Sequence, residues 1–364
     1  MKTLYFSGVY QRGHKYFDQK IISNLAAVSE VIVMTPPYWF SHKEEQVVYI
    51  ENGVDSKRSR LPHLKLLGVT LKNYKKALHI ARKNQIDCLI AGEYELLSVW
   101  FLAILNRKKL FLIHHYNLDQ MERKWFFRFL FQMIKNKVHH VVLEPYIGTH
   151  LIQDLKVPKE KICCWPHPVE VLEREESKEE EKEGPKGETL EEYDCVGLSN
   201  SNDSEMVHRI LQHEKNTQEI GKSDLKIIVK SSKDEYDAGG LKIIKGNLDQ
   251  EMYERYIQRA KTMLVCFPKS YQYRVSAVIM ESVRNFIPII GSEFRLLTYY
   301  KKRYPNIFFL CNERNLKDVI RQAQEVPEVL KKKEFQEFIR DHSDEIIQKA
   351  MRESFQQEMI KSLE

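Results

Sequence analysis

Short apolar runs rich in β-branched and aromatic residues alternate, in the first half of the chain, with longer segments whose apolar residues recur at helical spacing. Segments 14–28 (HKYFDQKIISNLAAV) and 71–85 (LKNYKKALHIARKNQ) have the helical pattern. The runs that predict strands are 2–8 (KTLYFSG), 30–35 (EVIVMT), 87–92 (DCLIAG), 109–114 (KLFLIH), 139–144 (HHVVLE) and 161–165 (KICCW). Strands that alternate with helices form parallel βαβ units, so we expect an α/β fold with a doubly wound parallel sheet.

An acidic stretch interrupts this pattern, which then starts again. Residues 170–192 (EVLEREESKEEEKEGPKGETLEE) hold almost no large apolar side chain after Leu172, too few to fold alone. The strand runs that follow are 193–198 (YDCVGL), 225–230 (LKIIVK), 241–246 (LKIIKG), 262–267 (TMLVCF), 287–292 (IPIIGS) and 306–311 (NIFFLC). The predicted organisation is a Rossmann-like domain at 1–169, an acidic linker or exposed insertion at 170–192, a second Rossmann-like domain at 193–328, and charged C-terminal helices at 329–364 that pack back toward the first domain.

Composition is consistent with two soluble domains. A length of 364 residues exceeds the usual size of one core, and no apolar run approaches the roughly 20 residues that span a bilayer. The first residues, MKTLYFSGVYQRG, lack the long apolar core of a signal peptide, so a cytoplasmic location is expected. Six cysteines without CxxC spacing argue for buried thiols and against a sulfur-bound metal. The net charge of +6 suits anionic ligands or a membrane surface without indicating nucleic acid.

One carboxylate stands out in the second half, in the segment YQYRVSAVIMESVRNFIPIIGS at 271–292. Glu281 lies between two apolar runs, in a helix for which Ser276 is a suitable N-cap and which Arg274 precedes. A helix N-terminus with a nearby guanidinium can bind a diphosphate, and a carboxylate can accept both hydroxyls of a ribose. The alternative is that Glu281 pairs with Arg284 or Arg274 and has no ligand.

Two lysines follow predicted strands of the same half. Lys230 closes one strand and Lys269 comes shortly after another, where open α/β sheets bind their ligands. Both are candidates for neutralising the phosphates of a leaving nucleotide. The alternative is that they are ordinary surface lysines.

The segment YRVSAVIMESVRNFIPIIGS resembles the donor-site signature of the retaining family-4 glycosyltransferases, enzymes of the GT-B fold with a cleft between two Rossmann-like domains. The resemblance implies that Glu281 holds the ribose, while 287–290 (IPII) match the strand of the signature and Tyr273 stands where the family often has a second, donor-binding glutamate. It also implies a nucleoside-diphosphate sugar as co-substrate, no metal or other cofactor, and retention of the anomeric configuration.

Loops of the first half offer candidates for the acceptor side. Gly13 allows a tight turn beside a ligand, and the adjacent His14 can carry a proton near neutral pH. His114, His115 and Asn117 end another strand, and adjacent residues on a strand point in opposite directions, so at most one of the two histidines is expected to act. We therefore expect the three histidines to be the catalytic candidates and Gly13 and Asn117 to contact the acceptor.

Residues 121–137 (MERKWFFRFLFQMIKNK) have the pattern of a basic amphipathic helix. At 100° per residue, Lys124, Arg128 and Lys135 form a narrow stripe and apolar residues fill the remaining arc. Such a helix can lie on an anionic inner leaflet, and it can equally be a core helix with a solvated basic stripe.

These observations predict a metal-independent glycosyltransferase of the hexosyltransferase type. Its donor would be a nucleotide sugar and its acceptor a hydroxyl, for example on a lipid-linked or cell-surface polysaccharide precursor, with no nucleic acid as partner. Two alternatives stay open: an enzyme similar to a UDP-sugar 2-epimerase, and a catalytically degenerate GT-B subunit that binds an active partner. No GxGxxG or GxxxxGK[ST] motif is present, which disfavours an oxidoreductase or a nucleoside triphosphatase.

Overall fold

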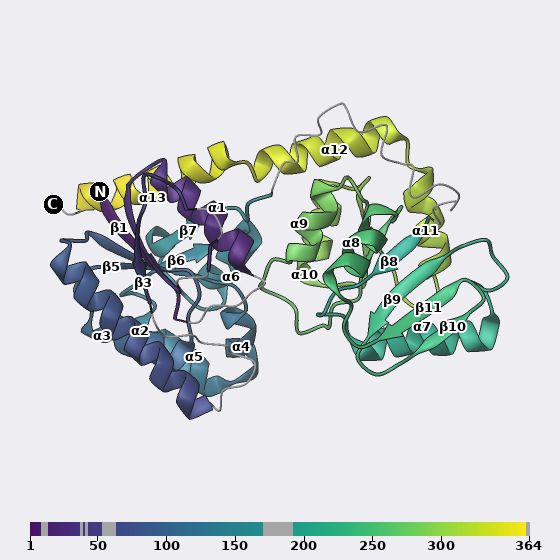
Figure 1. Cartoon of the computed structure of the whole chain (residues 1–364), viewed down its shortest axis with the longest axis horizontal. Helices are drawn as coiled ribbons and strands as arrows, with labels where there is room; N and C mark the ends of the chain where they lie inside the picture. Colours follow the sequence, from purple (N-terminus) through teal and green to yellow (C-terminus); the bar gives the residue numbers. More distant parts are fainter. Residues whose placement is uncertain (9–13, 37–38, 41–42, 53–62, 170–191, 362–364) are drawn as a thin grey trace. The chain divides into compact units, whose positions relative to one another are not determined.

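The computed structural model describes residues 1–8, 14–36, 39–40, 43–52, 63–169 and 192–361, with the side chains of 63–66 and 358–361 left aside. The chain divides into two units (Figure 1). Unit 1 consists of Met1–Pro168, Tyr273–Val275 and Asp341–Glu364, and unit 2 of Val169–Gln272 and Ser276–Arg340.

The described residues of unit 1 form a sheet of seven strands in the order β3-β2-β1-β4-β5-β6-β7, and every neighbouring pair is parallel. Its strands are β1 (Lys2–Phe6), β2 (Glu30–Thr35), β3 (Val48–Glu51), β4 (Cys88–Ala91), β5 (Lys109–Ile113), β6 (His139–Val142) and β7 (Ile162–Cys164). Its helices are α1 (Lys15–Ala26), α2 (His63–Lys83), α3 (Leu96–Leu105), α4 (Asn117–Arg123), α5 (Trp125–Ile134), α6 (Pro145–Gln153) and α13 (Asp344–Lys361).

Unit 2 has a second seven-stranded sheet in its described part, with the order β10-β11-β9-β8-β12-β13-β14. The edge pair β10 and β11 is antiparallel and the remaining pairs are parallel. Its strands are β8 (Cys195–Gly197), β9 (Ile227–Ser231), β10 (Tyr236–Ala238), β11 (Leu241–Lys245), β12 (Met263–Val265), β13 (Ile289–Gly291) and β14 (Phe308–Leu310). Its helices are α7 (Ser204–Thr217), α8 (Gln250–Gln258), α9 (Ala277–Arg284), α10 (Arg295–Arg303), α11 (Leu316–Glu325) and α12 (Glu328–Asp341).

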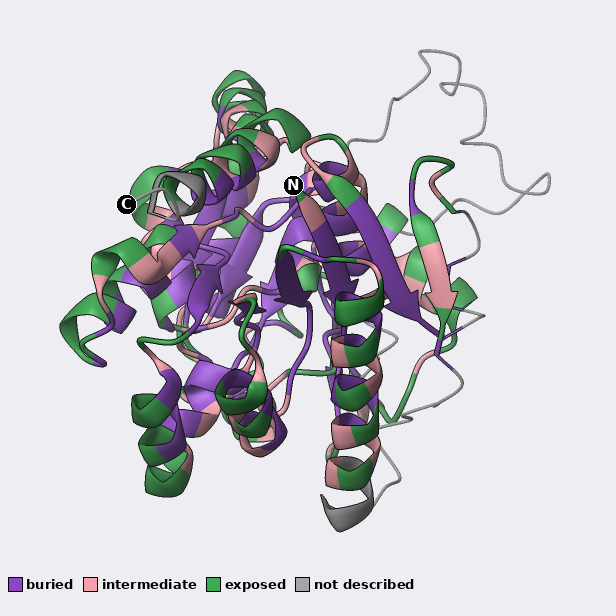
Figure 2. Ribbon diagram, turned by 90° about the vertical axis from the view of Figure 1, so that its left-hand side faces the viewer, coloured by how far each residue is buried: buried purple, intermediate pink, exposed green. Residues whose placement is uncertain are grey.

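The central strands are apolar on both faces because helices cover the sheet on both sides. In β1, Leu4 and Phe6 pack in one hydrophobic cluster while Tyr5, which points the other way, packs in a second cluster. Figure 2 shows the consequence, with buried residues concentrated on the strands and exposed residues on the outer faces of the helices. The near-continuous apolar runs in the sequence therefore have a direct structural cause.

The strands that the sequence pattern predicts are all present, and the two it misses are edge strands. Val48 of β3 is 55% exposed, and two of the three residues of β10 are exposed. The residues of β10 (YDA) hold no apolar run, so the pattern gives no signal there, whereas β3 lies in the apolar run VVYI at 47–50 and could have been predicted.

Unit boundaries differ from the predicted ones at the C-terminal end. The chain returns to unit 1 at Asp341 and not near Val329, because α12 packs on unit 2 through Phe335 and Phe338, whose rings contact Phe286 and Tyr300 respectively. The predicted linker or insertion at 170–192 lies, except for its last residue, outside the described residues. No helix in the described part of the chain is both long and apolar enough to cross a bilayer.

The predicted helix at 121–137 is two helices. Lys124 is extended, with φ −132° and ψ 104°, so α4 ends at Arg123 and α5 begins at Trp125. The predicted single amphipathic stripe is thus wrong, and only 125–134 has one helical face.

In the described part of the chain, four non-glycine residues that follow helices, Gln85, Lys156, Gln218 and Phe286, have the left-handed backbone that usually favours glycine. Gln218 ends α7 at φ 56°, and Phe286 follows α9 at φ 57°. Phe286 N–H donates to Val283 O and Ile287 N–H donates to Ser282 O, the bond pair of a Schellman motif. The Gln218 side chain is exposed, whereas the ring of Phe286 lies 5.4 Å from that of Phe335.

We predict opposite effects of glycine at these two positions. Gln218→Gly should raise the free energy of unfolding by about 1 kcal/mol, because it relieves the left-handed backbone and removes no packing. Phe286→Gly relieves the same strain but loses about 2 kcal/mol of ring burial, so it should lower stability by about 1 kcal/mol. Denaturant unfolding of both variants and of Gln218→Ala checks this; equal effects at both positions would contradict it.

Candidate functional site

The order of the strands in unit 1 changes direction at β1 and β4, and loops that leave these strands meet at the carboxyl edge of the sheet. Gly8 N–H donates to Glu93 O at 2.7 Å, and Glu93 N–H donates to Ser7 Oγ at 3.1 Å. Open α/β sheets bind ligands at such a switch point, where the diverging chain leaves a crevice. The loops after β1 and β4 therefore form the place in unit 1 where a ligand is expected.

His14 lies at this switch point beside a buried carboxylate. Its Nδ1 is 3.6 Å from Glu93 Oε2, and the two side chains are 25% and 2% exposed. The ring of His115 is 4.4 Å from that of His14, and its Nε2 donates to Gly92 O at 3.0 Å. Burial lowers the pKa of His115, so this imidazole is neutral. The structure thus brings together two of the three predicted histidines; Gly13 lies outside the described residues.

His114 belongs to a buried chain of hydrogen bonds and does not face the sheet edge. Tyr94 Oη bonds to His114 Nδ1 at 2.7 Å, His114 Nε2 bonds to His140 Nδ1 at 2.9 Å, and His140 Nε2 bonds to Lys135 O at 2.9 Å. Because a carbonyl only accepts, His140 donates from Nε2, His114 donates to His140, and Tyr94 donates to His114. Burial lowers the pKa of both histidines, that of His140 to about 4.

Asn117 is also buried and structural. Its Nδ2 donates to Tyr94 O at 2.8 Å, and the residue has no exposed surface. The prediction that His114 and Asn117 reach an acceptor is therefore wrong for this structure, because both side chains are used inside the unit. The sequence could not separate them from His115, since all follow the same strand.

Arg274 and Tyr273 belong to unit 1, where Asp119 holds them. The buried Asp119 accepts from Tyr273 N–H at 2.8 Å and from Arg274 Nε at 2.6 Å. The Tyr273 ring is buried and stacks on His150, with centroids 3.6 Å apart. The ion pair with Asp119 uses Nε of the Arg274 guanidinium, and the expected fork from Arg274 to a diphosphate stays a prediction.

Lys230, in unit 2, is a buried lysine whose ammonium bonds to the neutral side chains of two exposed residues. It is 8% exposed, and its Nζ donates to Asn200 Oδ1 and, at 3.2 Å, to Asn247 Oδ1. No carboxylate in the described part of the chain lies within ion-pair distance of it. Burial lowers its pKa, because nothing of opposite charge compensates for lost hydration. A cation held in this way at the carboxyl end of β9 favours an anionic ligand.

Asn202 fixes the switch point of unit 2, between β8 and β12. Its Nδ2 donates to Gly197 O at 2.9 Å, and its Oδ1 accepts from Cys266 N–H at 3.3 Å. The next residue, Asp203, caps α7 by accepting from Glu205 N–H. The loop that carries Asn200 is therefore anchored on both sides of the strand ends.

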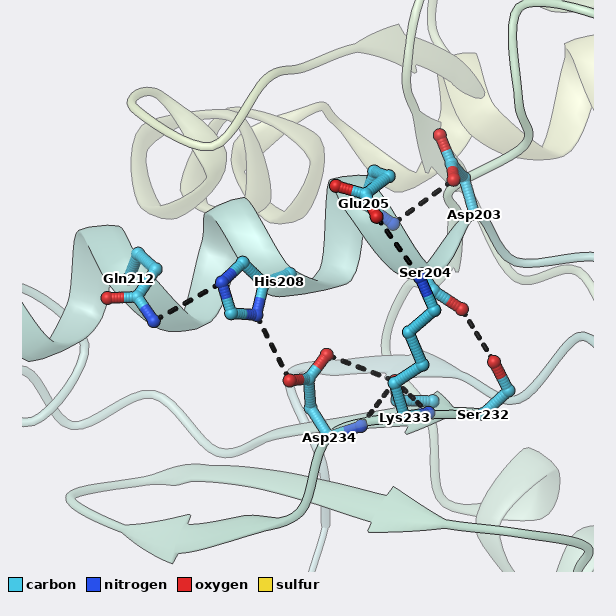
Figure 3. A network of polar contacts seen from close by, with 9 residues as sticks. Asp203, Ser204, Glu205, His208, Gln212, Ser232, Lys233 and Asp234 are labelled. Carbon is cyan, nitrogen blue, oxygen red and sulfur yellow. Dashed lines mark hydrogen bonds and ion pairs between the residues drawn. The ribbon is translucent and has the colours of Figure 1, made fainter.

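A second network ties the loop after β9 to α7. His208 Nδ1 bonds to Asp234 Oδ1 at 3.0 Å, and Ser204 Oγ bonds to Ser232 Oγ at 2.6 Å. Figure 3 shows these bonds, together with the ion pair of Lys233 and Glu205. Loops after β8 and β9 are thus held together around the segment that presents Lys230.

The carboxylate of Glu281 faces α8, which carries Tyr253. Tyr253 Oη donates to Glu281 Oε2 at 2.6 Å, and burial raises the pKa of Glu281 while the bond from Tyr253 and the charge of Arg284 lower it. The predicted N-cap position of Ser276 is correct, but its buried hydroxyl makes no capping bond. Lys269 is exposed after β12, and no direct bond joins Glu281 to Lys230 or Lys269.

Sequence reasoning missed Glu93, Asn200, Asn247 and Tyr253. The first three follow the strands β4, β8 and β11 directly, and that position was a usable signal. Tyr253 gave no signal, because a tyrosine in a helix is far more often a packing residue. Nowhere in the described part of the chain do three or more His, Cys, Asp or Glu side chains form a group that could hold a metal.

Two Rossmann-like units, each with polar groups at the carboxyl edge of its sheet, are the elements of a GT-B glycosyltransferase. Residues 21–171 match the family model described as Glycosyltransferase Family 4. The matched residues make up most of unit 1, and the predicted resemblance is confirmed. No curated protein matched the sequence.

Solved structures of the same fold cover the whole chain. Sucrose-phosphate synthase from Thermosynechococcus elongatus is 13% identical at a TM-score of 0.68, over 99% of this chain and 100% of that one. HepE from Anabaena, solved in complex with UDP, is 12% identical at a TM-score of 0.64, over 98% of this chain and 100% of that one. A glycosyltransferase from Rickettsia africae is 11% identical at a TM-score of 0.61, over 97% of both chains. At this identity the likeness shows the fold, and together with the family domain it supports the predicted glycosyltransferase.

The buried histidines predict a loss of stability in acid. An unfolded chain takes up a proton on histidine below about pH 6.5, whereas folded His140 does so only near its pKa of about 4. The free energy of unfolding should thus fall as pH decreases from about 6.5 to about 4, by up to about 3 kcal/mol for this residue. His140→Gln should make that slope shallower and the exposed control His208→Gln should not; an unchanged slope in His140→Gln would refute this prediction.

Proposed function

We propose that this glycosyltransferase moves a hexosyl group from a nucleoside-diphosphate sugar to a hydroxyl acceptor. The observation that carries this proposal is Lys230, a buried lysine at the carboxyl edge of unit 2 whose ammonium bonds, within the described part of the chain, only to neutral groups. A diphosphate supplies the missing negative charge, and the ammonium in turn stabilises the charge that develops on the leaving nucleotide. The Anabaena protein of the same fold was solved with UDP, which supports a nucleotide at this fold.

Glu281 is the proposed ribose ligand. Its carboxylate already accepts from Tyr253, and its free lone pairs can accept from two vicinal hydroxyls. The bond from Tyr253 fixes the rotamer of the carboxylate and opposes the rise in pKa that burial causes. Tyr253 is therefore a positioning residue for Glu281.

His14 is the proposed residue on the acceptor side. Its imidazole lies beside the carboxylate of Glu93, and its ring nitrogens can hydrogen-bond a hydroxyl and so orient it at the switch point of unit 1. By resemblance to family 4 the anomeric configuration is retained: the bond from the anomeric carbon to the diphosphate breaks, the bond to the acceptor oxygen forms, and the acceptor proton passes to a phosphate oxygen. The proposed reaction uses no metal.

A lipid-linked or cell-surface polysaccharide precursor is the proposed acceptor. The exposed aromatic face of α5, within 121–137, gives the enzyme a means of contact with an inner leaflet, where such an acceptor is held. The enzyme is then a cytoplasmic protein that binds peripherally to the membrane.

Nucleotide binding by unit 2 is tested by thermal shift with UDP, GDP, ADP and uridine. A nucleoside diphosphate at about 100 times its dissociation constant should add about 2.7 kcal/mol to stability. Lys230→Met should weaken the diphosphate at least about tenfold and leave the nucleoside unaffected, because it removes a charge-assisted bond to phosphate. Glu281→Gln should weaken both. Lys242→Met, an exposed lysine on β11, is the control; diphosphate binding that survives Lys230→Met would exclude this site.

Transfer of sugar tests the acceptor side. His14→Asn and Glu93→Gln should each reduce the rate of transfer by about a hundredfold, with nucleotide binding intact, because a misplaced acceptor hydroxyl costs about this much. Release of nucleotide that depends on an added acceptor distinguishes transfer from epimerisation. Wild-type protein that binds a nucleotide sugar but neither transfers nor epimerises would identify a degenerate subunit and refute the proposed catalysis.

A further inference from the structure

Two neighbouring helices of unit 1 expose a group of large apolar side chains to solvent. On α5, Trp125 is 79% exposed and Phe129 54%, with Phe126 and Met133 also exposed. The opposite face of α5 is buried through Leu130, Phe131 and Ile134. Exposed apolar groups of this size on one helix face mark a binding surface.

The α3 helix widens this surface, which the sequence pattern did not indicate. Phe101, Ile104 and Leu105 are exposed on one face of α3, with Leu105 at 66%, and α3 packs against α5. We call Phe101, Ile104, Leu105, Trp125, Phe126, Phe129 and Met133 together the α3–α5 surface. Since α3 is apolar almost throughout, its sequence has no polar face that would show which side of the helix is exposed.

Basic residues surround the α3–α5 surface. The stretch 96–137, which holds both helices, has eight lysines and arginines and two acidic residues. Of these two acids, Asp119 is buried and ion-paired with Arg274, so only Glu122 is exposed. The region therefore has a strong positive charge toward solvent.

A small basic cavity adjoins the same surface at Leu105. Its volume is about 430 Å³, and it lies between the C-terminal ends of α2 and α3. Arg82, Arg107 and Lys108 line it together with aliphatic groups, and no acidic residue is among its lining residues. Three cations around an enclosed space suit a phosphate group.

We propose that the α3–α5 surface docks on an anionic lipid bilayer, with the cavity of Arg82, Arg107 and Lys108 binding a lipid phosphate. Tryptophan and phenylalanine insert well at the boundary between headgroups and acyl chains, and lysine and arginine around them contact anionic headgroups. A second copy of this chain is the less suitable occupant. Isologous pairing would place the same basic residues of both copies against one another.

The surface also lies on the acceptor-binding unit. Helix α3 begins after β4, so its N-terminal end is near the carboxyl edge of the sheet that carries His14 and Glu93, whereas its C-terminal end, with the basic cavity, lies at the opposite edge. Docking through the outer face of α3 and α5 would hold unit 1 at the bilayer in one orientation. The lipid-linked acceptor of the proposed function then reaches the enzyme from the bilayer. The docking itself does not depend on the proposed function; only this purpose of the docking rests on it.

Vesicle flotation tests the docking. Wild-type protein should bind vesicles of phosphatidylcholine with phosphatidylglycerol, bind less as salt rises, and bind poorly to phosphatidylcholine alone. Trp125→Glu with Phe129→Glu should weaken binding at least about tenfold, since each loses an inserted aromatic ring. Val329→Glu in unit 2, at a side chain that is also 79% exposed, is the matched control and should bind like the wild type.

Separate measurements test the lipid-phosphate cavity and the alternative occupant of the surface, a second copy of the chain. Arg107→Ala with Lys108→Ala should reduce binding to the anionic vesicles about tenfold without lowering binding to phosphatidylcholine alone. Vesicle binding that the Trp125→Glu, Phe129→Glu protein retains would overturn the proposal. If the wild type forms a dimer in sedimentation that the Trp125→Glu, Phe129→Glu variant does not form, and if the wild type does not bind vesicles, the surface serves self-association and not membrane docking. The thermal shift with UDP must be unchanged in both variants, so a failed donor site and a failed docking surface are told apart.

Discussion

A positive charge without a negative partner, at the carboxyl edge of unit 2, is the constraint on which the account of this protein depends. Lys230 is a buried residue, and in the described part of the chain its ammonium donates only to the amide oxygens of Asn200 and Asn247, two residues that are exposed to solvent. Such an arrangement costs stability unless an anion completes it. The loops around it are fixed by Asn202 and by the network at the start of α7, so the cost is held in a rigid part of unit 2.

Unit 1 repeats this logic with the opposite charge. Glu93 is a buried carboxylate at the switch point between β1 and β4, and His14 is the nearby group that can carry a proton. In unit 1 the functional groups follow β1 and β4, the strands at the switch point, where parallel sheets leave room for a ligand. In unit 2, Lys230 lies at the carboxyl end of β9, next to the switch point between β8 and β12. The α3–α5 surface adds a third element, on the outer face of α3 and α5.

Much of the fold could be predicted from the sequence, because a parallel strand buried on both faces leaves a continuous apolar run. Edge strand β10 leaves none, whereas edge strand β3 lies in the apolar run VVYI and was missed for no physical reason. The break at Lys124 depends on backbone angles that no periodicity records. At the candidate site, position after a strand identified Lys230 and His14 but could not distinguish His115 from the buried His114. Arg274 belongs to unit 1 because it pairs with Asp119, and these two residues are 155 positions apart in the sequence. A local sequence pattern cannot predict such a contact.

The most direct test of the central claim is a crystal structure of the chain with a bound nucleoside diphosphate. The account predicts phosphate oxygens within hydrogen-bond distance of Lys230 Nζ and ribose hydroxyls on the carboxylate of Glu281. A nucleotide bound elsewhere, with Lys230 still bonded only to Asn200 and Asn247, would contradict it.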